Sequence, residues 1–137
     1  GPTGETLRAR AERAGVGAVF TGFVADEDLP ALLSGASCFV TASRYEGFGL
    51  PALEAIACGT PVVAFDVGAV PEVAGPGCLA VRDGDGDALM RAVARVCDDS
   101  ALRRRLSTEG LAHARRYSWR RTAELTWQAY EHVASDG

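Results

Sequence analysis

The run Pro61–Phe65 is apolar at every position, without the alternation of polar and apolar side chains that marks a half-exposed strand. Strands of this kind are buried on both faces, and they occur chiefly in parallel sheets that helices cover on both sides. Similar short apolar runs recur along the chain between segments with helical spacing. The sequence therefore predicts an α/β fold with a parallel, Rossmann-like sheet and helices on both faces.

The expected elements alternate between helix and strand four times and then continue as helices alone. Strands are expected at Val16–Phe20, Ser37–Val40, Pro61–Phe65 and Cys78–Val81. Helices are expected at Glu5–Ala14, Asp26–Leu33, Pro51–Ala57, Val70–Val73, Asp87–Val96, Ala101–Arg115 and Trp119–Val133. No linker, repeat or low-complexity tract divides the chain, so residues 1–137 are interpreted as a single, partial domain.

Composition and charge exclude several classes of function. Hydrophobic residues make up 47% and charged residues 23% of the 137, as in soluble globular proteins. All 14 basic residues are arginines, because the sequence contains no lysine, so a Schiff-base lysine and a P-loop lysine are both excluded. The net charge of −4 argues against nucleic acid as a partner, and the arginine pairs are interpreted as solvated helix faces.

The four cysteines predict neither a metal site nor a disulfide framework. Cys38, Cys58, Cys78 and Cys97 lie about twenty residues apart without a C-x-x-C pair, a spacing that fits no zinc site. Cys38 lies in an apolar run and Cys97 on the apolar side of an expected helix. Buried free thiols in a reducing compartment are therefore predicted.

Two further patterns are interpreted as structural. Asp83–Asp87 is similar to the start of a calcium-binding loop but lacks the glycine and glutamate needed further on, so it predicts a turn that caps the next helix. Trp119, Trp127 and Tyr130 have roughly helical spacing, which predicts packing in the core rather than a ligand stack.

Ligands of such sheets bind beyond the carboxyl ends of the strands, so the loops that follow strands are the candidate sites. The loop at residues 41–50 contains Gly47 and Gly49 immediately before a helix in which Pro51 is expected at the first position. The glycines expose backbone N–H groups at a helix N-terminus, where a phosphate can bind. Two glycines alone also fit a connecting loop without function.

Two carboxylates make the same loop more informative. Glu46 precedes the glycines, and Glu54 is expected in the first turn of the helix, where it could also merely complement the helix dipole. A carboxylate accepts two hydroxyl hydrogen bonds, as from a ribose diol or a sugar ring. A phosphate seat with two diol acceptors beside it describes a site for a nucleotide sugar.

The segment Glu46–Glu54 resembles the E-x7-E signature of glycosyltransferase family 4, retaining enzymes with two Rossmann-like domains in the GT-B fold. The resemblance extends to further segments, namely Val19–Val24, Asp28–Pro30, Glu54–Val63, Val67–Val73 and Tyr117–Trp119. It covers almost the whole chain, although Ala69 stands where the family usually has a second glycine.

The resemblance implies a role for each matched residue. Glu54 would bind the ribose hydroxyls, and Glu46 would act as the catalytic residue beside the donor sugar. Contacts to the sugar and diphosphate would come from the glycine loop, that is Gly47, Phe48, Gly49 and Leu50, and contacts to the base from the main chain near Val24. The family transfers a sugar from a nucleotide-diphosphate donor to an acceptor, with retention of configuration and without a required metal or cofactor.

The family pattern also contains parts that have no counterpart in this sequence. Family members are considerably longer, with an N-terminal acceptor-binding domain and two further donor-domain strands that carry a glycine loop and an Arg/Lys pair. The sequence is therefore interpreted as the C-terminal, donor-binding half, truncated at its N-terminal side and inactive alone. Arg44 is the only cation near the loop, at a position that the family does not use consistently.

The incomplete sheet predicts an open strand edge and possible self-association through it. Two other functions stay open at this stage, a sugar-nucleotide 2-epimerase of the same fold and a non-catalytic nucleotide-sugar-binding or scaffold module. The base, the sugar and the acceptor are not determined by these residues. By resemblance, the expected location is cytoplasmic, with the full-length enzyme at the inner face of the membrane.

Overall fold

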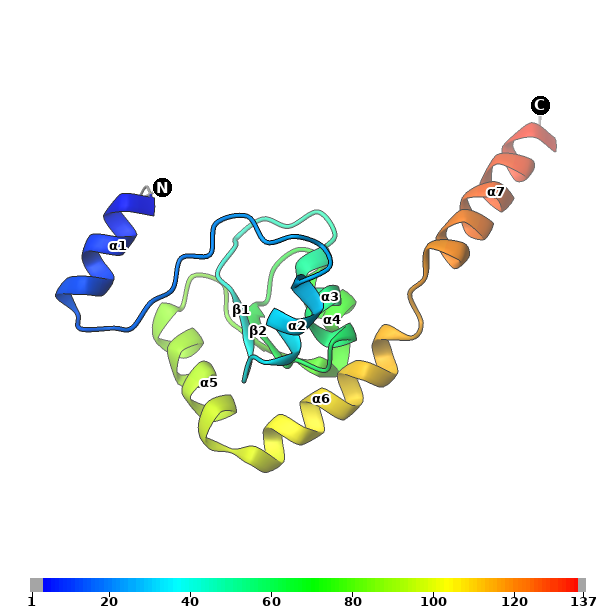
Figure 1. Cartoon of the computed structure of the whole chain (residues 1–137). Helices are drawn as coiled ribbons and strands as arrows, with labels where there is room; N and C mark the ends of the chain where they lie inside the picture. Colours follow the sequence, from blue (N-terminus) through cyan, green and yellow to red (C-terminus); the bar gives the residue numbers. More distant parts are fainter. Residues whose placement is uncertain (1–3, 136–137) are drawn as a thin grey trace.

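The computed structural model describes residues 4–135, which form a small parallel sheet covered by helices (Figure 1). Its strands are β1 (Phe39–Thr41), β2 (Val62–Phe65) and β3 (Cys78–Val81), in the order β1-β2-β3. Both pairings are parallel, with Val62 of β2 opposite Phe39 of β1 and Cys78 of β3. The predicted α/β class with a parallel sheet is confirmed.

Most helices form close to their expected positions. They are α1 (Gly4–Arg13), α2 (Leu29–Ser34), α3 (Leu50–Ala57), α4 (Val70–Ala74), α5 (Gly86–Asp98), α6 (Ser100–Ala114) and α7 (Trp119–Ser135), with a 3-10 turn η1 at Gly75–Gly77. The predicted capping turn at Asp83–Asp87 is confirmed, because the Asp85 carboxylate accepts a hydrogen bond from the Ala88 amide at the start of α5. Asp99 caps α6 in the same way through the amides of Ala101 and Leu102.

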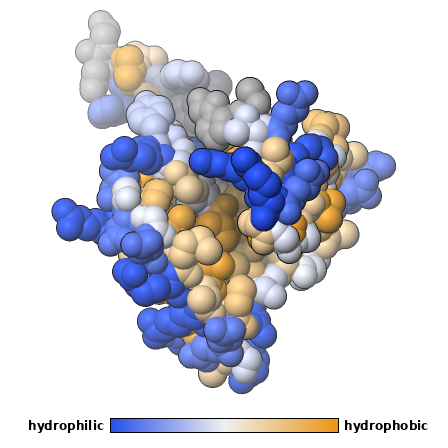
Figure 2. Space-filling view, turned by 90° about the vertical axis from the view of Figure 1, so that its left-hand side faces the viewer, coloured by the Kyte–Doolittle hydropathy of each residue, from blue (hydrophilic) through white to orange (hydrophobic). Residues whose placement is uncertain are grey.

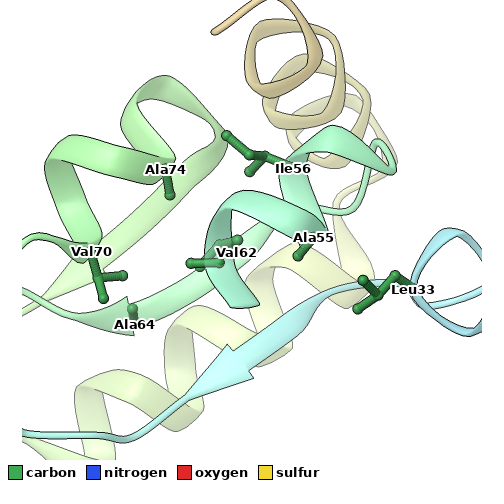
Figure 3. Packing of buried hydrophobic residues seen from close by; sticks show 8 residues of the cluster. Leu33, Ala55, Ile56, Val62, Ala64, Val70 and Ala74 are labelled. Carbon is green, nitrogen blue, oxygen red and sulfur yellow. The ribbon is translucent and has the colours of Figure 1, made fainter. Parts of the chain in front are cut away.

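Strand β2 is buried on both faces, as its continuous apolar sequence predicts. On one face Val62 and Ala64 pack against residues of α2, α3 and α4, among them Leu33, Ala55, Ile56, Val70 and Ala74 (Figure 3). On the other face Val63 and Phe65 pack against α5 and α6 through Leu89, Ala92, Val96, Leu102 and Leu106. Helices therefore cover both faces of the sheet, and β2 holds the two cores together.

The predicted strand at Val16–Phe20 is wrong. These residues belong to an extended connection between α1 and α2, and the Val19 side chain is 87% exposed (Figure 1). A strand needs a neighbour to bond its backbone N–H and C=O groups. Strand β1 pairs only with β2, and no segment of residues 4–135 pairs with residues 16–20. The sheet thus has the open edge that the sequence predicts, whereas self-association remains a prediction.

Helices α1 and α7 bury no residue and extend away from the sheet (Figure 1). Seen from the side on which α1 lies in Figure 1, the surface shows apolar residues among hydrophilic ones (Figure 2). The prediction that Trp119, Trp127 and Tyr130 pack in the core is wrong, because all three side chains are exposed. Their helical spacing gives α7 an apolar face, but nothing in the described part of the chain covers that face.

All four cysteines are free, and their burial differs from the prediction. Cys97 is exposed, so its predicted burial is wrong, and the other three are half-buried. Burial, helped by the charge of Asp66, raises the pKa of the Cys78 thiol to about 12. Burial, followed by the neighbouring Cys97 thiol, raises the pKa of Cys38 to about 11. Both thiols are therefore protonated and unreactive near neutral pH.

Candidate functional site

The loops that follow β1, β2 and β3 meet at the carboxyl edge of the sheet. Gly68, after β2, approaches the loop after β1 so closely that a Cβ atom there would lie 2.6 Å from the Glu46 carbonyl oxygen. The loop after β3 is joined to it by Arg44, which donates from Nε and Nη2 to the two carboxylate oxygens of Asp83, each at 3.1 Å. The loop that carries Glu46 is therefore held between its two neighbours.

Gly49 allows this loop to enter α3. It is the N-cap of the helix, with a φ of 87° in the left-handed region that glycine alone adopts readily. A Cβ atom at this position would also lie 3.0 Å from Cγ2 of Val70, the first residue of α4. A larger residue would thus be strained and would push the N-termini of α3 and α4 apart.

Three consecutive backbone amides at the start of α3 are left without partners. The Gly49 carbonyl accepts from the amides of Ala52 and Leu53, which closes the first turn. The amides of Phe48, Gly49 and Leu50 make no hydrogen bond with any of residues 4–135. Such free N–H groups at the positive end of a helix form a seat for an anion or a polar oxygen.

The structure corrects two details of the predicted loop. Helix α3 begins at Leu50, so Pro51 is its second residue rather than its first. Glu54 is the fifth residue and lies beyond the first turn, which contains no acidic residue. Because the helix dipole acts mainly within the first turn, complementing it does not explain Glu54. The glutamate is exposed and available to a ligand.

Glu54 lies in the wall of a hollow of about 290 Å³ between α3 and the start of α7. The hollow is mostly apolar and is lined by Phe48, Leu50, Leu53, Glu54, Ala57, Ala114, Tyr117, Ser118, Trp119 and Thr122. The turn before α7 and its first residues were not predicted to belong to the site. Tyr117–Trp119 could have suggested it, since an aromatic pair around a serine before an exposed helix fits a ligand surface as well as a core.

Glu46 is half-buried and lines a second, smaller hollow of about 110 Å³ at the carboxyl end of β1. Its other lining residues are Phe39, Val40, Thr41, Gly49, Pro51, Ala52 and Val70. The two hollows therefore lie on either side of the loop at residues 48–50, each with one glutamate. Gly47 is exposed in the same loop but lines neither hollow, and Val24 is half-buried and lines neither as well.

An aromatic chain holds the wall of the larger hollow in place. The Phe48 ring meets Tyr117 edge-on, with centroids 6.2 Å apart, and Tyr117 contacts the His113 ring at 5.5 Å. His113 lies in turn 3.2 Å, through Nε2, from the carbonyl oxygen of Glu72 in α4. Phe48 is thus connected to the packed end of α6 rather than left as a free loop tip.

The ion pair in the loop determines the local charge. The hydrogen bond from Arg44 holds the pKa of Asp83 below its usual range, and the same bond raises the pKa of Arg44. The positive charge of Arg44 is therefore neutralised by Asp83 rather than free for a phosphate. Among residues 4–135, no group of three or more His, Cys, Asp or Glu side chains is arranged to hold a metal ion.

Residues 1–113 match the protein family described as glycosyl transferases group 1. The chain belongs to this family. The resemblance to glycosyltransferase family 4 is thereby confirmed. The match includes the glycine loop and both glutamates, whereas the start of α7 lies outside it.

Relatives with related activities share substantial sequence identity with the chain. It is 42% identical to the O-antigen chain mannosyltransferase B of Escherichia coli over 112 residues, which are 82% of this chain and 29% of the relative. It is 37% identical to a D-inositol 3-phosphate glycosyltransferase of Streptomyces griseus, covering 99% of this chain and 31% of the relative. The chain thus spans less than a third of the length of these curated relatives.

Solved structures confirm the GT-B fold. The sucrose-phosphate synthase of Thermosynechococcus elongatus superposes with a TM-score of 0.86 at 31% identity, over 97% of this chain and 35% of that one. The HepE protein of Anabaena, solved in complex with UDP, gives 0.78 at 25% identity over 96% of this chain and 36% of that one. In the described part of this chain, no helix has the length and apolarity to cross a bilayer.

Proposed function

We propose that this chain is the donor-binding part of a retaining glycosyltransferase that uses a nucleotide-diphosphate sugar. The observation that carries the proposal is the seat of three unbonded amides at residues 48–50, with Glu46 on one side and Glu54 on the other. The seat offers hydrogen bonds to phosphate or sugar oxygens, and each glutamate accepts from a hydroxyl pair. The likeness to a structure that contains UDP supports the same assignment.

The hollow beside Glu54 suits the nucleoside. Glu54 accepts hydrogen bonds from the ribose hydroxyls, while the apolar and aromatic wall made by Phe48, Tyr117 and Trp119 contacts the ring systems of the ligand. The hollow is of the size of small-ligand pockets, which begin at about 300 Å³. We assign it to the nucleoside, and the amide seat to the diphosphate.

Glu46 then faces the donor sugar. Its half-buried carboxylate accepts from sugar hydroxyls and stabilises the positive charge that develops at the anomeric carbon as the glycosidic bond breaks. The amides at residues 48–50 stabilise the negative charge that develops on the departing diphosphate. The acceptor hydroxyl attacks the anomeric carbon from the face that the diphosphate leaves and gives its proton to the departing diphosphate, so the configuration of the sugar is preserved. This scheme assigns no role to a metal ion or a cofactor.

The charge balance predicts that this chain alone binds donor weakly. Since Arg44 is paired with Asp83, the diphosphate meets dipoles of the backbone rather than a free cation. The acceptor site is not assigned to any residue described here, and we expect the chain alone not to transfer sugar. The half-buried thiols fit a reducing compartment, so the cytoplasm is the proposed location.

Ligand-detected NMR with UDP, GDP and ADP, each with and without its hexose, tests the assignment. We expect one nucleotide to bind, and Glu54→Ala to weaken that binding about tenfold, because a charge-assisted hydrogen-bond acceptor is lost. Glu109→Ala, which removes an exposed glutamate of α6 outside both hollows, is the matched control and should bind as the wild type does. If Glu54→Ala and Glu109→Ala bind the nucleotide equally well, Glu54 is not in the donor site.

A further inference from the structure

A third hollow, of about 390 Å³, lies at the opposite end of the sheet from the donor site. It is lined by Gly35, Ala36, Ser37, Gly59, Pro61, Arg103, Arg104, Ser107 and Thr108, and is called the arginine groove below. Ser37 precedes β1 and Pro61 precedes β2, whereas the glycine loop of the donor site follows β1. The arginine groove is therefore a separate site.

The wall from α6 contributes two arginines and no acidic residue to the lining of the groove. Arg103 is half-buried and donates from Nη1 to the carbonyl oxygens of Val96 and Cys97, at 3.0 and 2.7 Å, which fixes its guanidinium at the end of α5. Arg104, the next residue along α6, is exposed and also lines the groove. No acidic residue lines the groove, and the Asp99 carboxylate, which senses the Arg104 charge, is used as the cap of α6.

The hydroxyl groups of the arginine groove are unpaired within the described chain. Thr122, Thr126 and Ser135 of α7 each donate to the carbonyl four residues earlier, the usual partner of a helical hydroxyl. The side-chain hydroxyls of Ser37, Ser107 and Thr108 form no hydrogen bond with any of residues 4–135. Gly59, with a φ of 80°, forms the opposite wall of the groove. A Cβ atom at Gly59 would lie 3.4 Å from Oγ of Ser107, so the two walls lie close together.

We propose that the arginine groove binds the phosphate group of an anionic ligand, either a small phosphorylated molecule or the headgroup of an anionic lipid. Guanidinium groups match phosphate oxygens through paired N–H donors, and free hydroxyls complete the coordination. The volume exceeds that of the hollow beside Glu54 and falls within the range of small-ligand sites. This site does not depend on the proposed donor function, because it shares no lining residue with the donor hollows.

The test follows the amide resonances of the isotope-labelled chain during a titration with inorganic phosphate. The titration is carried out at about 0.15 M salt, where attraction between distant surface charges is screened. We expect saturable shifts at Ser37, Gly59 and Thr108. Arg104→Gln should weaken this binding about tenfold, the effect of losing one charge-assisted contact. Arg105→Gln removes the adjacent exposed arginine, which does not line the groove, and should leave the affinity unchanged.

A vesicle experiment distinguishes the two sources of phosphate. Sedimentation with vesicles of phosphatidylcholine and phosphatidylglycerol, but not of phosphatidylcholine alone, assigns the groove to a lipid headgroup if Arg104→Gln abolishes it. Saturable phosphate binding without sedimentation assigns it to a small phosphorylated molecule. The proposal is overturned if the chain neither binds phosphate saturably nor sediments with the vesicles. It is also overturned if Arg104→Gln and Arg105→Gln weaken phosphate binding equally. Glu54→Ala should leave the phosphate-induced shifts at Ser37 and Gly59 unchanged. Failure of the donor assignment can therefore be distinguished from failure of the phosphate site.

Discussion

Strand β2 and the segment at residues 16–20 have similar apolar sequences but opposite environments. Val62 of β2 is fully buried, whereas Val19 is 87% exposed. The same contrast separates α5, which buries Leu89 and Val96, from α7, whose Trp119 is 80% exposed. An apolar pattern thus indicates that a segment is suited to burial. Whether the segment is buried depends on whether another element of the fold packs against it.

The two segments differ in whether other elements pack against them on both edges and both faces. Strand β2 lies between β1 and β3 and between two layers of helices, so it has a neighbouring strand at each edge and a hydrophobic cluster on each face. Residues 16–20 meet no strand, and α7 meets no sheet face, within residues 4–135. The stability of the chain should therefore reside in residues 29–114.

The largest expected effect comes from shortening a buried side chain of α3. Ile56→Ala should lower the free energy of unfolding by about 3 kcal/mol, because Ile56 is 1% exposed and its loss leaves a cavity. Trp127→Ala removes a larger but exposed side chain of α7 and should change it by no more than about 0.5 kcal/mol. Urea unfolding followed by circular dichroism measures both. A greater loss for Trp127→Ala would reverse the comparison.

A smaller effect is expected from a glycine contact in the packed region. A Cβ at Gly77 would lie 2.8 Å from the Gly110 Cα and from Ile56 Cγ2, where η1 crosses α6. Gly77→Ala should therefore destabilise the chain by about 2 kcal/mol through overpacking. Gly17→Ala is the matched control, because a Cβ there meets nothing within 4 Å. Equal unfolding midpoints for the two variants would show that η1 and α6 separate without cost.

The smallest effect concerns the exposed ion pair of the glycine loop. The lowered pKa of Asp83 means that its charged form stabilises the folded state above its unfolded pKa, about 4, and that this contribution is lost as the pH falls through the lowered value. Asp83→Asn should therefore be less stable than the wild type at neutral pH and equal to it in strong acid.

Thermal unfolding from neutral to acid pH measures this difference. Glu124→Gln is the control, since it removes an ion pair with Arg121 that lies within α7 and joins no two loops. Identical stability of Asp83→Asn and the wild type at neutral pH would show that the Arg44–Asp83 pair does not hold the loops together.

The candidate site shows how far sequence reasoning reaches. The glycines and glutamates of residues 46–54 could be singled out because their chemistry is local: missing Cβ atoms, a helix start and two carboxylates. The walls of the hollow beside Glu54 could not be singled out in this way, because Tyr117 and Trp119 are more than sixty positions from Glu54 in the sequence. They lie beside Glu54 only because α6 leads the chain back to that place. The pairing of Arg44 with Asp83 joins residues 39 positions apart and likewise depends on the sheet.

The sequence by itself determined the fold class, most helix positions, the buried central strand and the loop that carries the candidate site. These follow from local periodicity, capping and turn chemistry, which act over a few residues. Only the tertiary structure decided which apolar segments are covered, that Val16–Phe20 forms no strand and that Trp119 faces a hollow. The physical reason is that burial and strand pairing are properties of two surfaces in contact, and one segment's sequence contains only one of them.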